Sequence, residues 1–454
     1  MMQKKISAIV TLLVIILFLV NHSWGAGFAL YENSARGGAI CGAFAARADD
    51  PSALFYNPSG ITQLQGRQIS NGLNTYTGIV EINYPGGRES VEDKTWVVPN
   101  FYLSQQMTDN IWLGIGAFAP YGLGNKYRED WYGRYNMYHA EIACVEVNPN
   151  IAYKFSDSLS FAFGLSTQHF SILSKRKVGL QNVVIEDLVT NKNFTLENAK
   201  LTYINQFAEY FDTLPDIDQE VSVNKFAYRF NISFRFALND KISIGANYRS
   251  KVSYTLSGDA KYKQLPQKHP LFPQLDSPVN DMNIFFQDAD LKVDISLPDI
   301  YAFGFAYAVN DKLTVEADIV HTQWSRYDKL IYHFQNGIGD AVDRANWSNV
   351  NCYRLGAEYQ VNESLTARFG YLLDESPLDD NYIDFALPGN ERHLFTTGFG
   401  FKYNKFIIDG YYGLVICLDR DNKENLNKNA FIDYEWQHRK SYTHHLGFNA
   451  TYVF

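Results

Sequence analysis

The sequence lacks several features that mark common classes of protein. Beyond residue 25 it has no apolar run that approaches the roughly 20 residues of a membrane-spanning helix. It also has no long basic run, and its 49 Asp and Glu outnumber its 40 Lys and Arg. The sequence therefore excludes a helical membrane protein and argues against nucleic acid as a partner.

Cysteine and catalytic motifs are also scarce. The four cysteines lie far apart, without C-x-x-C or metal-ligand spacing, at Cys41, Cys144, Cys352 and Cys417. We therefore expect isolated thiols, no bound metal and no cofactor. Histidines are scattered, and the adjacent His444 and His445 point to opposite faces of a strand. Because no acid, base and nucleophile fall together, we predict no catalytic residues and no enzyme activity.

Aromatic residues, in contrast, are abundant, and many alternate with polar residues. The chain has 31 Tyr and 32 Phe. From Phe226 to Leu238 every even position is apolar, whereas the odd positions are Ala, Arg, Asn or Ser. Residues 441–454 repeat this pattern. A period of two indicates β-strands with one face toward lipid or a core and the other toward water.

Short polar turns separate these strands and indicate their number. They occur at 107–110, 156–158, 239–241, 310–312, 362–364 and 403–405. Counting the strands on both sides of each turn, with a first and a last strand, predicts fourteen. Short turns at one end, long loops at the other and an even strand number are typical of an outer-membrane barrel. A soluble β-sandwich would not explain the difference between turns and loops.

We therefore predict an all-β fold, a fourteen-stranded antiparallel transmembrane β-barrel over residues 65–454. Residues 1–25 combine Lys4 and Lys5, the apolar run 6–20 and small residues at 23 and 25, which is typical of a secretory signal peptide. Residues 26–64 do not alternate, yet their apolar side chains need burial. We expect them to form a plug, or hatch, inside the lumen; a disordered periplasmic tail is the alternative.

Several segments resemble a known family. Residues 26–64, AGFALYENSARGGAICGAFAARADDPSALFYNPSGITQL, are similar to the N-terminal hatch of the FadL family of outer-membrane transporters for long-chain fatty acids and hydrocarbons. The resemblance continues in PYGL at 120–123, DWYGRY at 130–135, NPNIA at 148–152 and DESP at 374–377. One departure lies in the hatch turn Asn57-Pro58-Ser59, where the family usually has Ala at the third position. Serine adds only a hydroxyl, so we expect the turn to persist.

The resemblance implies a monomeric barrel with an extracellular groove, an inner pocket and a lateral opening beside a kinked third strand. Two long loops carry the candidate groove, with helical spacing in the first loop: Leu201, Ile204, Phe207 and Phe211, followed by Leu271 and Phe272 in the second. In the alternative, these loops simply pack together over the barrel. The resemblance also implies that Phe28 and Leu30 lie near the inner ligand.

Four cations are candidates for binding a carboxylate in the lumen. Alternation directs Arg229 and Arg235 of one strand, and Arg249 and Lys251 of the next, toward the interior. A cation in an apolar pocket makes strong, charge-assisted hydrogen bonds with a carboxylate. The alternative is that these cations pair with lumen acids, for which Glu316, Asp318 and Glu358 are the candidates.

Pro120 interrupts an apolar strand and marks the candidate lateral gate. Proline cannot donate a hydrogen bond to a neighbouring strand. A turn at Thr108 and Asp109 would place residues whose numbers sum to 217, within one or two, opposite each other. Phe118 would then face Pro99, and Pro120 would face Val97. We predict a gate formed by Pro99, Phe118, Ala119, Pro120, Tyr121 and Gly122; a β-bulge at the barrel rim is the alternative.

These features together predict passive uptake of hydrophobic molecules through the outer membrane of a Gram-negative bacterium. Long-chain fatty acids are the expected cargo. An aromatic hydrocarbon importer of the same family, a polar-solute porin and a surface barrel that acts as an adhesin or antigen are the alternatives. Outer-membrane lipids and lipopolysaccharide are further expected partners, with the basic cluster 175–177 as the contact to lipid phosphates.

Overall fold

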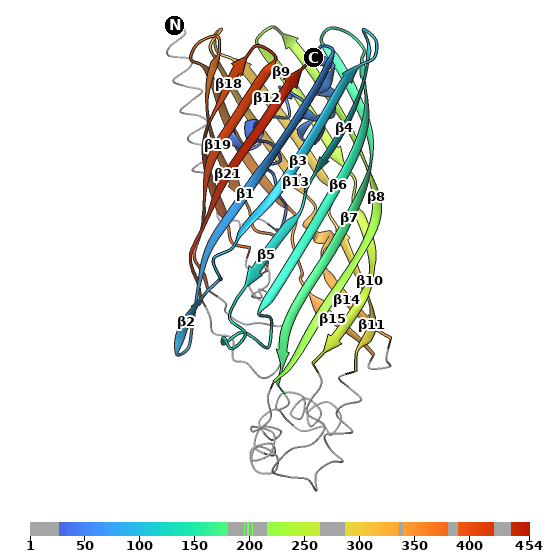
Figure 1. Cartoon of the computed structure of the whole chain (residues 1–454), viewed down its shortest axis with the longest axis vertical. Helices are drawn as coiled ribbons and strands as arrows, with labels where there is room; N and C mark the ends of the chain where they lie inside the picture. The colour runs from blue at the N-terminus through green and yellow to red at the C-terminus, as the bar shows by residue number, and fades with distance from the viewer. Residues whose placement is uncertain are drawn as a thin grey trace.

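The protein forms a closed barrel of antiparallel β-strands around its N-terminal segment (Figure 1). A computed structural model describes residues 27–179, 216–263, 287–335, 339–379, 389–421 and 437–454, together with residues 195, 198 and 202. The predicted signal peptide lies outside these residues. Fourteen wall strands follow one another round the ring, so the predicted fold is confirmed.

Three of the wall strands are interrupted and carry two labels each. In order round the ring, the wall consists of β1 (Arg67–Tyr84), β3 (Thr95–Gln106), β4 (Ile111–Phe118) with β5 (Gly122–Lys126), β6 (His139–Lys154), β7 (Leu159–Val178), β8 (Ile217–Asn239), β9 (Ile242–Arg249) with β10 (Val252–Tyr262), β11 (Ala289–Leu297) with β12 (Ile300–Ala308), β13 (Leu313–Thr322), β16 (Val350–Gln360), β17 (Leu365–Asp374), β18 (Arg392–Tyr403), β19 (Phe406–Cys417) and β21 (Gln437–Val453). Short strands extend the sheet at the long-loop end: β2 (Gly87–Ser90), β14 (Lys329–Phe334), β15 (Gly339–Arg344) and β20 (Arg420–Asp421).

The first and last strands close the ring. β1 pairs with β21 from Gln68 opposite Val453 to Asn83 opposite Gln437. This pairing leaves no free edge at the first or the last strand of the sheet. This matters in lipid, where each unpaired backbone group costs on the order of several kcal/mol.

β8 shows how the alternating sequence produces a wall with two different faces. Phe226, Tyr228 and Phe230 are exposed on the outer surface, whereas Arg229 and Asn231 between them are buried in the lumen. The aromatic face therefore meets lipid, and the polar face is enclosed by the barrel. The alternation predicted from the sequence is present in this strand.

Asparagine side chains fix several of the short turns. The Oδ1 atoms of Asn239, Asn310 and Asn362 each accept hydrogen bonds from the backbone amides two and three residues further along, at 2.9–3.0 Å. These bonds satisfy amides that the turn would otherwise leave without a partner. The turns at these three positions form where the sequence predicts them.

Residues 27–64, here called the hatch segment, lie inside the ring of strands (Figure 1). They contain α2 (Ala35–Ala39), α3 (Ala53–Tyr56) and the 3-10 helix η1 (Pro58–Gln63). Ser34 is the N-cap of α2, because its Oγ accepts the Gly37 amide at 3.0 Å. Phe44 and Leu54 are fully buried.

The turn Asn57-Pro58-Ser59 begins η1. The Asn57 Oδ1 accepts the Ser59 amide at 3.2 Å and the Ser59 hydroxyl at 2.6 Å. The Asn57 Nδ2 donates to the carbonyls of Ala45 at 2.6 Å and Phe234 at 2.9 Å. The additional hydroxyl of Ser59 thus stabilises the turn, and Asn57 joins it to the wall.

Two acidic residues of β13 hold the loop between α2 and α3. The amides of Phe44 and Ala45 both donate to Asp318 Oδ2 at 2.9 Å. The amide of Ala46 donates to Glu316 Oε1 at 2.7 Å. Both carboxylates are buried, so these charge-assisted hydrogen bonds satisfy amides that have no access to water.

Three further observations concern the helices, the cysteines and the possible metal ligands of the described residues. No helix among them is long and apolar enough to cross a membrane. The four cysteines are all free. The described residues contain no group of three or more His, Cys, Asp or Glu side chains arranged to hold a metal ion.

Two lysines of the basic cluster 175–177 form ion pairs within the protein, and the expected contact of this cluster with lipid phosphates stays a prediction. Lys175 Nζ lies 2.7 Å from Glu220 Oε2, and Lys177 Nζ forms an ion pair with Asp218. Strand pairing between β7 and β8 brings these acids opposite the cations. Intramolecular pairs therefore neutralise the two lysines of this cluster.

Replacing Asp318 with Ala should loosen the hatch segment. The change leaves two buried amides without an acceptor, which should lower the free energy of unfolding by about 3 kcal/mol. Denaturant unfolding of the detergent-solubilised barrel would measure this loss. Glu363→Ala, in an exposed turn, is the control and should change stability little. Equal stability of both variants would contradict the anchoring role of Asp318.

Candidate functional site

The hydrogen-bonded wall is interrupted between β3 and β5. The ladder between β3 and β4 runs from Gln106 opposite Trp112 to Phe101 opposite Ala117, where it ends. Among the described residues, β5 pairs only with β6, and residues 95–99 of β3 pair only with β1. We call the unpaired edges of β3 and β5 the seam.

The register of this hairpin differs by one from the most direct expectation. Paired residues sum to 218, because the Met107 amide donates to the Ile111 carbonyl at 2.9 Å and leaves three loop residues between them. A three-residue loop gives an even sum, whereas the expected two-residue turn gives an odd one. Phe118 therefore does not face Pro99, and the ladder ends one residue before Phe118, at Ala117. On the other side of β3, Pro99 lies opposite Leu73 of β1.

The third wall strand contains a bulge next to the seam. Phe118 lies opposite Glu146 and Gly122 opposite Ala143, so three residues of this strand face two of β6. An extra residue exchanges the two faces of a strand. Phe118 and Tyr121 are both buried, although they are three positions apart and would lie on opposite faces of a regular strand. The structure thus contains a bulge at Pro120, the alternative named above, beside a break in the ladder; the gate itself stays a prediction.

The hatch segment supplies hydrogen bonds that the wall lacks. The Leu30 amide donates to the Pro120 carbonyl at 2.9 Å, and the Gly122 amide donates to the Phe28 carbonyl at 3.0 Å. Ala29 and Tyr121 form an isolated antiparallel bridge. The hatch segment therefore acts as a short substitute strand along the bulge, from the inside of the barrel.

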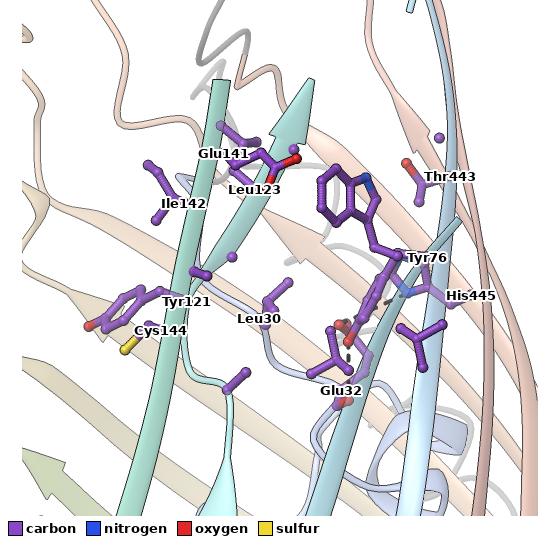
Figure 2. Close-up of a pocket in the computed structure, with 18 of the residues that line it drawn as sticks. Leu30, Glu32, Tyr76, Tyr121, Leu123, Glu141, Ile142, Cys144, Thr443 and His445 are labelled. Atoms are coloured by element: carbon purple, nitrogen blue, oxygen red, sulfur yellow. Dashed lines mark hydrogen bonds and ion pairs between the residues drawn. The ribbon is translucent and has the colours of Figure 1, made fainter. Parts of the chain in front are cut away.

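A cavity of about 740 Å³ lies between the seam and the hatch segment. Its seam side is largely apolar, with Val97, Val98, Leu123 and Ile142, whereas its inner side carries Glu32, Tyr76, Arg392 and His445. Figure 2 shows Leu30 between Tyr121 and Cys144 on one side and Glu32, Tyr76 and His445 on the other. Leu30 lines this cavity, next to the seam that its backbone helps to hold.

Phe28 occupies a cage of aromatic rings. Its ring centroid lies 4.9 Å from Trp324, 5.5 Å from Tyr327, 5.7 Å from Tyr121 and 5.8 Å from Trp347. Trp324 begins the 3-10 helix η2 (Trp324–Arg326), which follows β13. Phe28 is 2% exposed, so the cage encloses its ring almost completely.

Sequence reasoning missed Trp324 and Trp347. Both lie in segments outside the alternating strands, and 23 positions separate them in the chain. Their only local signal was the presence of large aromatic residues where neither strand nor helix spacing continues. Their meeting around Phe28 depends on contacts between residues about 300 positions apart.

Two of the four candidate cations, Arg235 and Arg249, bind backbone carbonyls of the hatch segment. Arg249 Nη1 lies 2.9 Å from Glu146 Oε1, and its Nη2 donates to the Phe55 carbonyl at 2.7 Å. Arg235 Nε donates to the Ala46 carbonyl at 2.9 Å. These two arginines therefore attach the hatch segment to the wall, and Arg249 also forms an ion pair.

Lys251 does not face the lumen as expected. Odd residues of β9, including Arg249, are buried, whereas even residues of β10, such as Val252, are buried. The interruption at residues 250–251 exchanges the two faces. Lys251 is consequently exposed.

Arg229 is the cation that remains without a full complement of partners. It is 2% exposed, and none of its three guanidinium nitrogens has a hydrogen bond within the described part of the chain. Its Nη1 lies 3.9 Å from Glu146 Oε2, which is an ion-pair distance without a hydrogen bond. The Tyr121 hydroxyl is likewise buried without a hydrogen-bond partner. Arg229 thus has unused donors for an anion.

The acids named as alternative partners for these cations bind the hatch segment instead. Glu316 and Asp318 accept backbone amides, as described above, and Glu358 lies 3.2 Å from Arg36 Nε and 2.9 Å from Arg47 Nη2. The candidate groove residues lie outside the described residues: Leu201, Ile204, Phe207, Phe211, Leu271 and Phe272.

A fourteen-stranded barrel with an enclosed N-terminal segment and a largely apolar cavity is an outer-membrane transport architecture. The family model described as outer membrane protein transport protein (OMPP1/FadL/TodX) matches residues 16–454. The chain belongs to this family, whose members carry hydrophobic substrates across the outer membrane of Gram-negative bacteria and are transporters rather than enzymes.

Relatives and solved structures agree with this assignment. A putative outer membrane protein of Neisseria meningitidis is 26% identical over 451 residues, covering 94% of both chains. The long-chain fatty acid transport protein of Escherichia coli K12 is 21% identical, covering 89% of this chain and 91% of its own. A Pseudomonas aeruginosa FadL homologue superposes with a TM-score of 0.77 at 17% identity, and the Pseudomonas putida toluene transporter TodX with 0.68 at 16%. These structures cover 94% of this chain and 99% of their own.

Replacing Phe28 with Ala should release the start of the hatch segment from the bulge. Removing a buried Phe ring costs about 3 kcal/mol, and the amides of Leu30 and Gly122 should then exchange hydrogen about 100-fold faster. Hydrogen exchange in detergent micelles would measure both. The amides of Ala45 and Ala46 are the internal control and should keep their protection. Unchanged exchange at Leu30 would contradict a docked role for Phe28.

Proposed function

We propose that the protein mediates passive uptake of long-chain fatty acids and releases them sideways through the seam. The observation that carries this proposal is the position of the cavity, which extends from Glu32 and Arg392 to the unpaired edges of β3 and β5. No energy source enters the proposal, since the ligand moves down its own gradient. The barrel acts as a monomer, as the resemblance implies.

Arg229 binds the carboxylate of the fatty acid in this proposal. Its support is the buried guanidinium, whose nitrogens have no hydrogen-bond partner among the described residues and which interacts with Tyr121, a ring 5.7 Å from that of Phe28. A carboxylate that accepts two of these donors gains charge-assisted hydrogen bonds in a site from which water is excluded. The acyl chain then takes the place of Phe28 among the aromatic rings.

In this proposal, a ligand that displaces the Phe28 ring also opens the path from the cavity to the seam. Phe28 and Leu30 belong to the same three residues that bond to Pro120 and Gly122. Movement of the Phe28 ring therefore strains the hydrogen bonds to Pro120 and Gly122. When these bonds break, the hatch segment no longer separates the cavity from the seam. The rest of the hatch segment stays in place through Glu316, Asp318 and Glu358.

Aromatic hydrocarbons are the second candidate cargo. The Phe28 ring, enclosed by four other aromatic rings within 5.8 Å, is itself a benzene-sized occupant. Solved structures of the same fold include toluene transporters. Uptake of labelled oleate and labelled toluene by a deletion strain, with and without this gene, separates the two. Import of neither would refute the transport proposal.

Arg229→Met should separate the two cargoes further. Loss of a charge-assisted hydrogen-bonding site costs about 1.5–3 kcal/mol, so oleate affinity should fall about 10- to 100-fold, while toluene uptake should be retained. Binding to the purified barrel and uptake in cells would measure these effects. Arg235→Met, which removes a cation that binds a hatch carbonyl, is the matched control. An equal loss of oleate binding in both variants would contradict the assignment to Arg229.

Replacing Phe118-Ala119-Pro120-Tyr121 with a regular alternating strand should restore the ladder at the seam. The expected result is loss of oleate uptake with normal assembly, because a continuous wall offers no lateral exit. Cell uptake and the heat-modifiable mobility of the folded barrel would be compared. Unchanged uptake in a correctly assembled variant would contradict lateral release.

A further inference from the structure

At the long-loop end of the seam, side chains rather than ladder hydrogen bonds connect β3 and the residue before it to β5 and β6. The cavity is lined here by Lys94, Trp96, Gly124 and Glu141. Trp96 is the largest of them. It belongs to the same face of β3 as the buried residues Asn100 and Tyr102, yet it is only partly buried. Its indole therefore lies at the boundary between the cavity and the outside.

The Trp96 ring lies directly against the backbone of Gly124. A Cβ at position 124 would stand 1.9 Å from Trp96 Cζ2 and 2.3 Å from its Cε2. Contacts this short do not occur, so any other residue at 124 would move the ring. Glycine at this position thus allows the indole to pack against the backbone of β5, where the ladder is missing.

A charged cluster holds the outer face of the ring. Lys94 Nζ lies 3.6 Å from the centroid of the Trp96 ring, which is within the range of a cation–π contact. The same ammonium donates to Glu141 Oε1 at 2.9 Å, across the seam on β6. His139 Nε2 lies 2.8 Å from the same oxygen. Figure 2 shows Glu141 beside Leu123 at the edge of the cavity.

A second ion pair fixes the end of the seam. Lys126 Nζ of β5 lies 2.6 Å from Glu92 Oε2, and the Glu92 amide donates to the Lys126 carbonyl at 2.7 Å. A backbone hydrogen bond and an ion pair thus join the end of β5 to the segment that precedes β3. Between Trp96 and Phe118, the seam residues that line the cavity are mostly apolar or glycine.

We propose that Trp96 is a movable gate that limits the width of the cargo leaving through the seam. The inference rests on lateral release as proposed above. In the closed position the indole lies on Gly124 under the Lys94 ammonium. Rotation of this one side chain widens the exit without breaking any backbone hydrogen bond of the wall. The gate is distinct from the hatch segment, which controls whether the cavity and the seam communicate.

The gate predicts that Trp96 determines cargo width rather than cargo chemistry. A slim acyl chain passes beside the indole, whereas a chain that ends in a bulky ring system requires the indole to move aside. Removing the ring should therefore favour wide cargo selectively. Weakening its hold, by removing the Lys94 ammonium, should have a smaller effect in the same direction.

The test compares uptake of oleate with uptake of a fatty acid that carries a bulky fluorophore at its methyl end. Trp96→Ala should raise uptake of the bulky probe about 10-fold relative to oleate, and Lys94→Met should raise it less. Gly124→Ala should displace the indole and also raise the ratio, and the Trp96→Ala/Gly124→Ala double variant should add nothing to Trp96→Ala. Thr95→Ala, on the outer face of the same strand, is the control.

Each outcome bears on one proposal. An unchanged ratio in Trp96→Ala, with normal oleate uptake, overturns the gate but not the transport function. Failure of the unaltered protein to import either probe overturns the proposed function instead. If Trp96→Ala does not assemble, Trp96→Phe replaces it in the test. Its smaller ring should give an intermediate ratio of bulky-probe uptake to oleate uptake. An unchanged ratio in this variant would again overturn the gate.

Discussion

The need to pair every backbone amide and carbonyl inside the bilayer is the constraint on which this structure depends. The β1–β21 ladder meets it by closing the ring. At the seam the wall strands leave backbone groups without ladder partners. There the hatch segment supplies hydrogen bonds to Pro120 and Gly122 from inside the barrel. The backbone hydrogen bonds of the barrel therefore tie the hatch segment to the wall at its weakest point.

A second interruption of the wall shows that a broken strand need not create an exit. β11 and β12 are separated by Pro298 and Asp299, opposite the break between β9 and β10. Here the Asp299 Oδ1 accepts the Lys251 amide at 3.0 Å and the Tyr248 hydroxyl at 2.7 Å. A carboxylate on the wall itself thus replaces the missing bonds, whereas at the seam the substitute is the backbone of the separate hatch segment.

The hatch segment is held unevenly along its length. Its middle is attached by buried charges, with Glu316 and Asp318 on its backbone and Glu358 between Arg36 and Arg47. Its start is attached by two backbone hydrogen bonds and the ring of Phe28. Buried charge-assisted contacts are costly to break, whereas an aromatic ring in an apolar cage exchanges readily with an apolar ligand. This difference is the reason that the proposed release involves the first residues of the hatch segment.

The sequence by itself determined the barrel, because period-two alternation and Asn-centred turns are local signals that a closed sheet must obey. It also marked Pro120 as an interruption of the wall, since proline cannot donate to a ladder, but it left a gate and a bulge as alternatives. Tertiary structure alone decided which residues form the site. The three-residue loop after Met107 changed the register, and the interruption at 250–251 placed Lys251 outside. The cage around Phe28 and the contact of Trp96 with Gly124 depend on how distant strands approach, which no local pattern encodes.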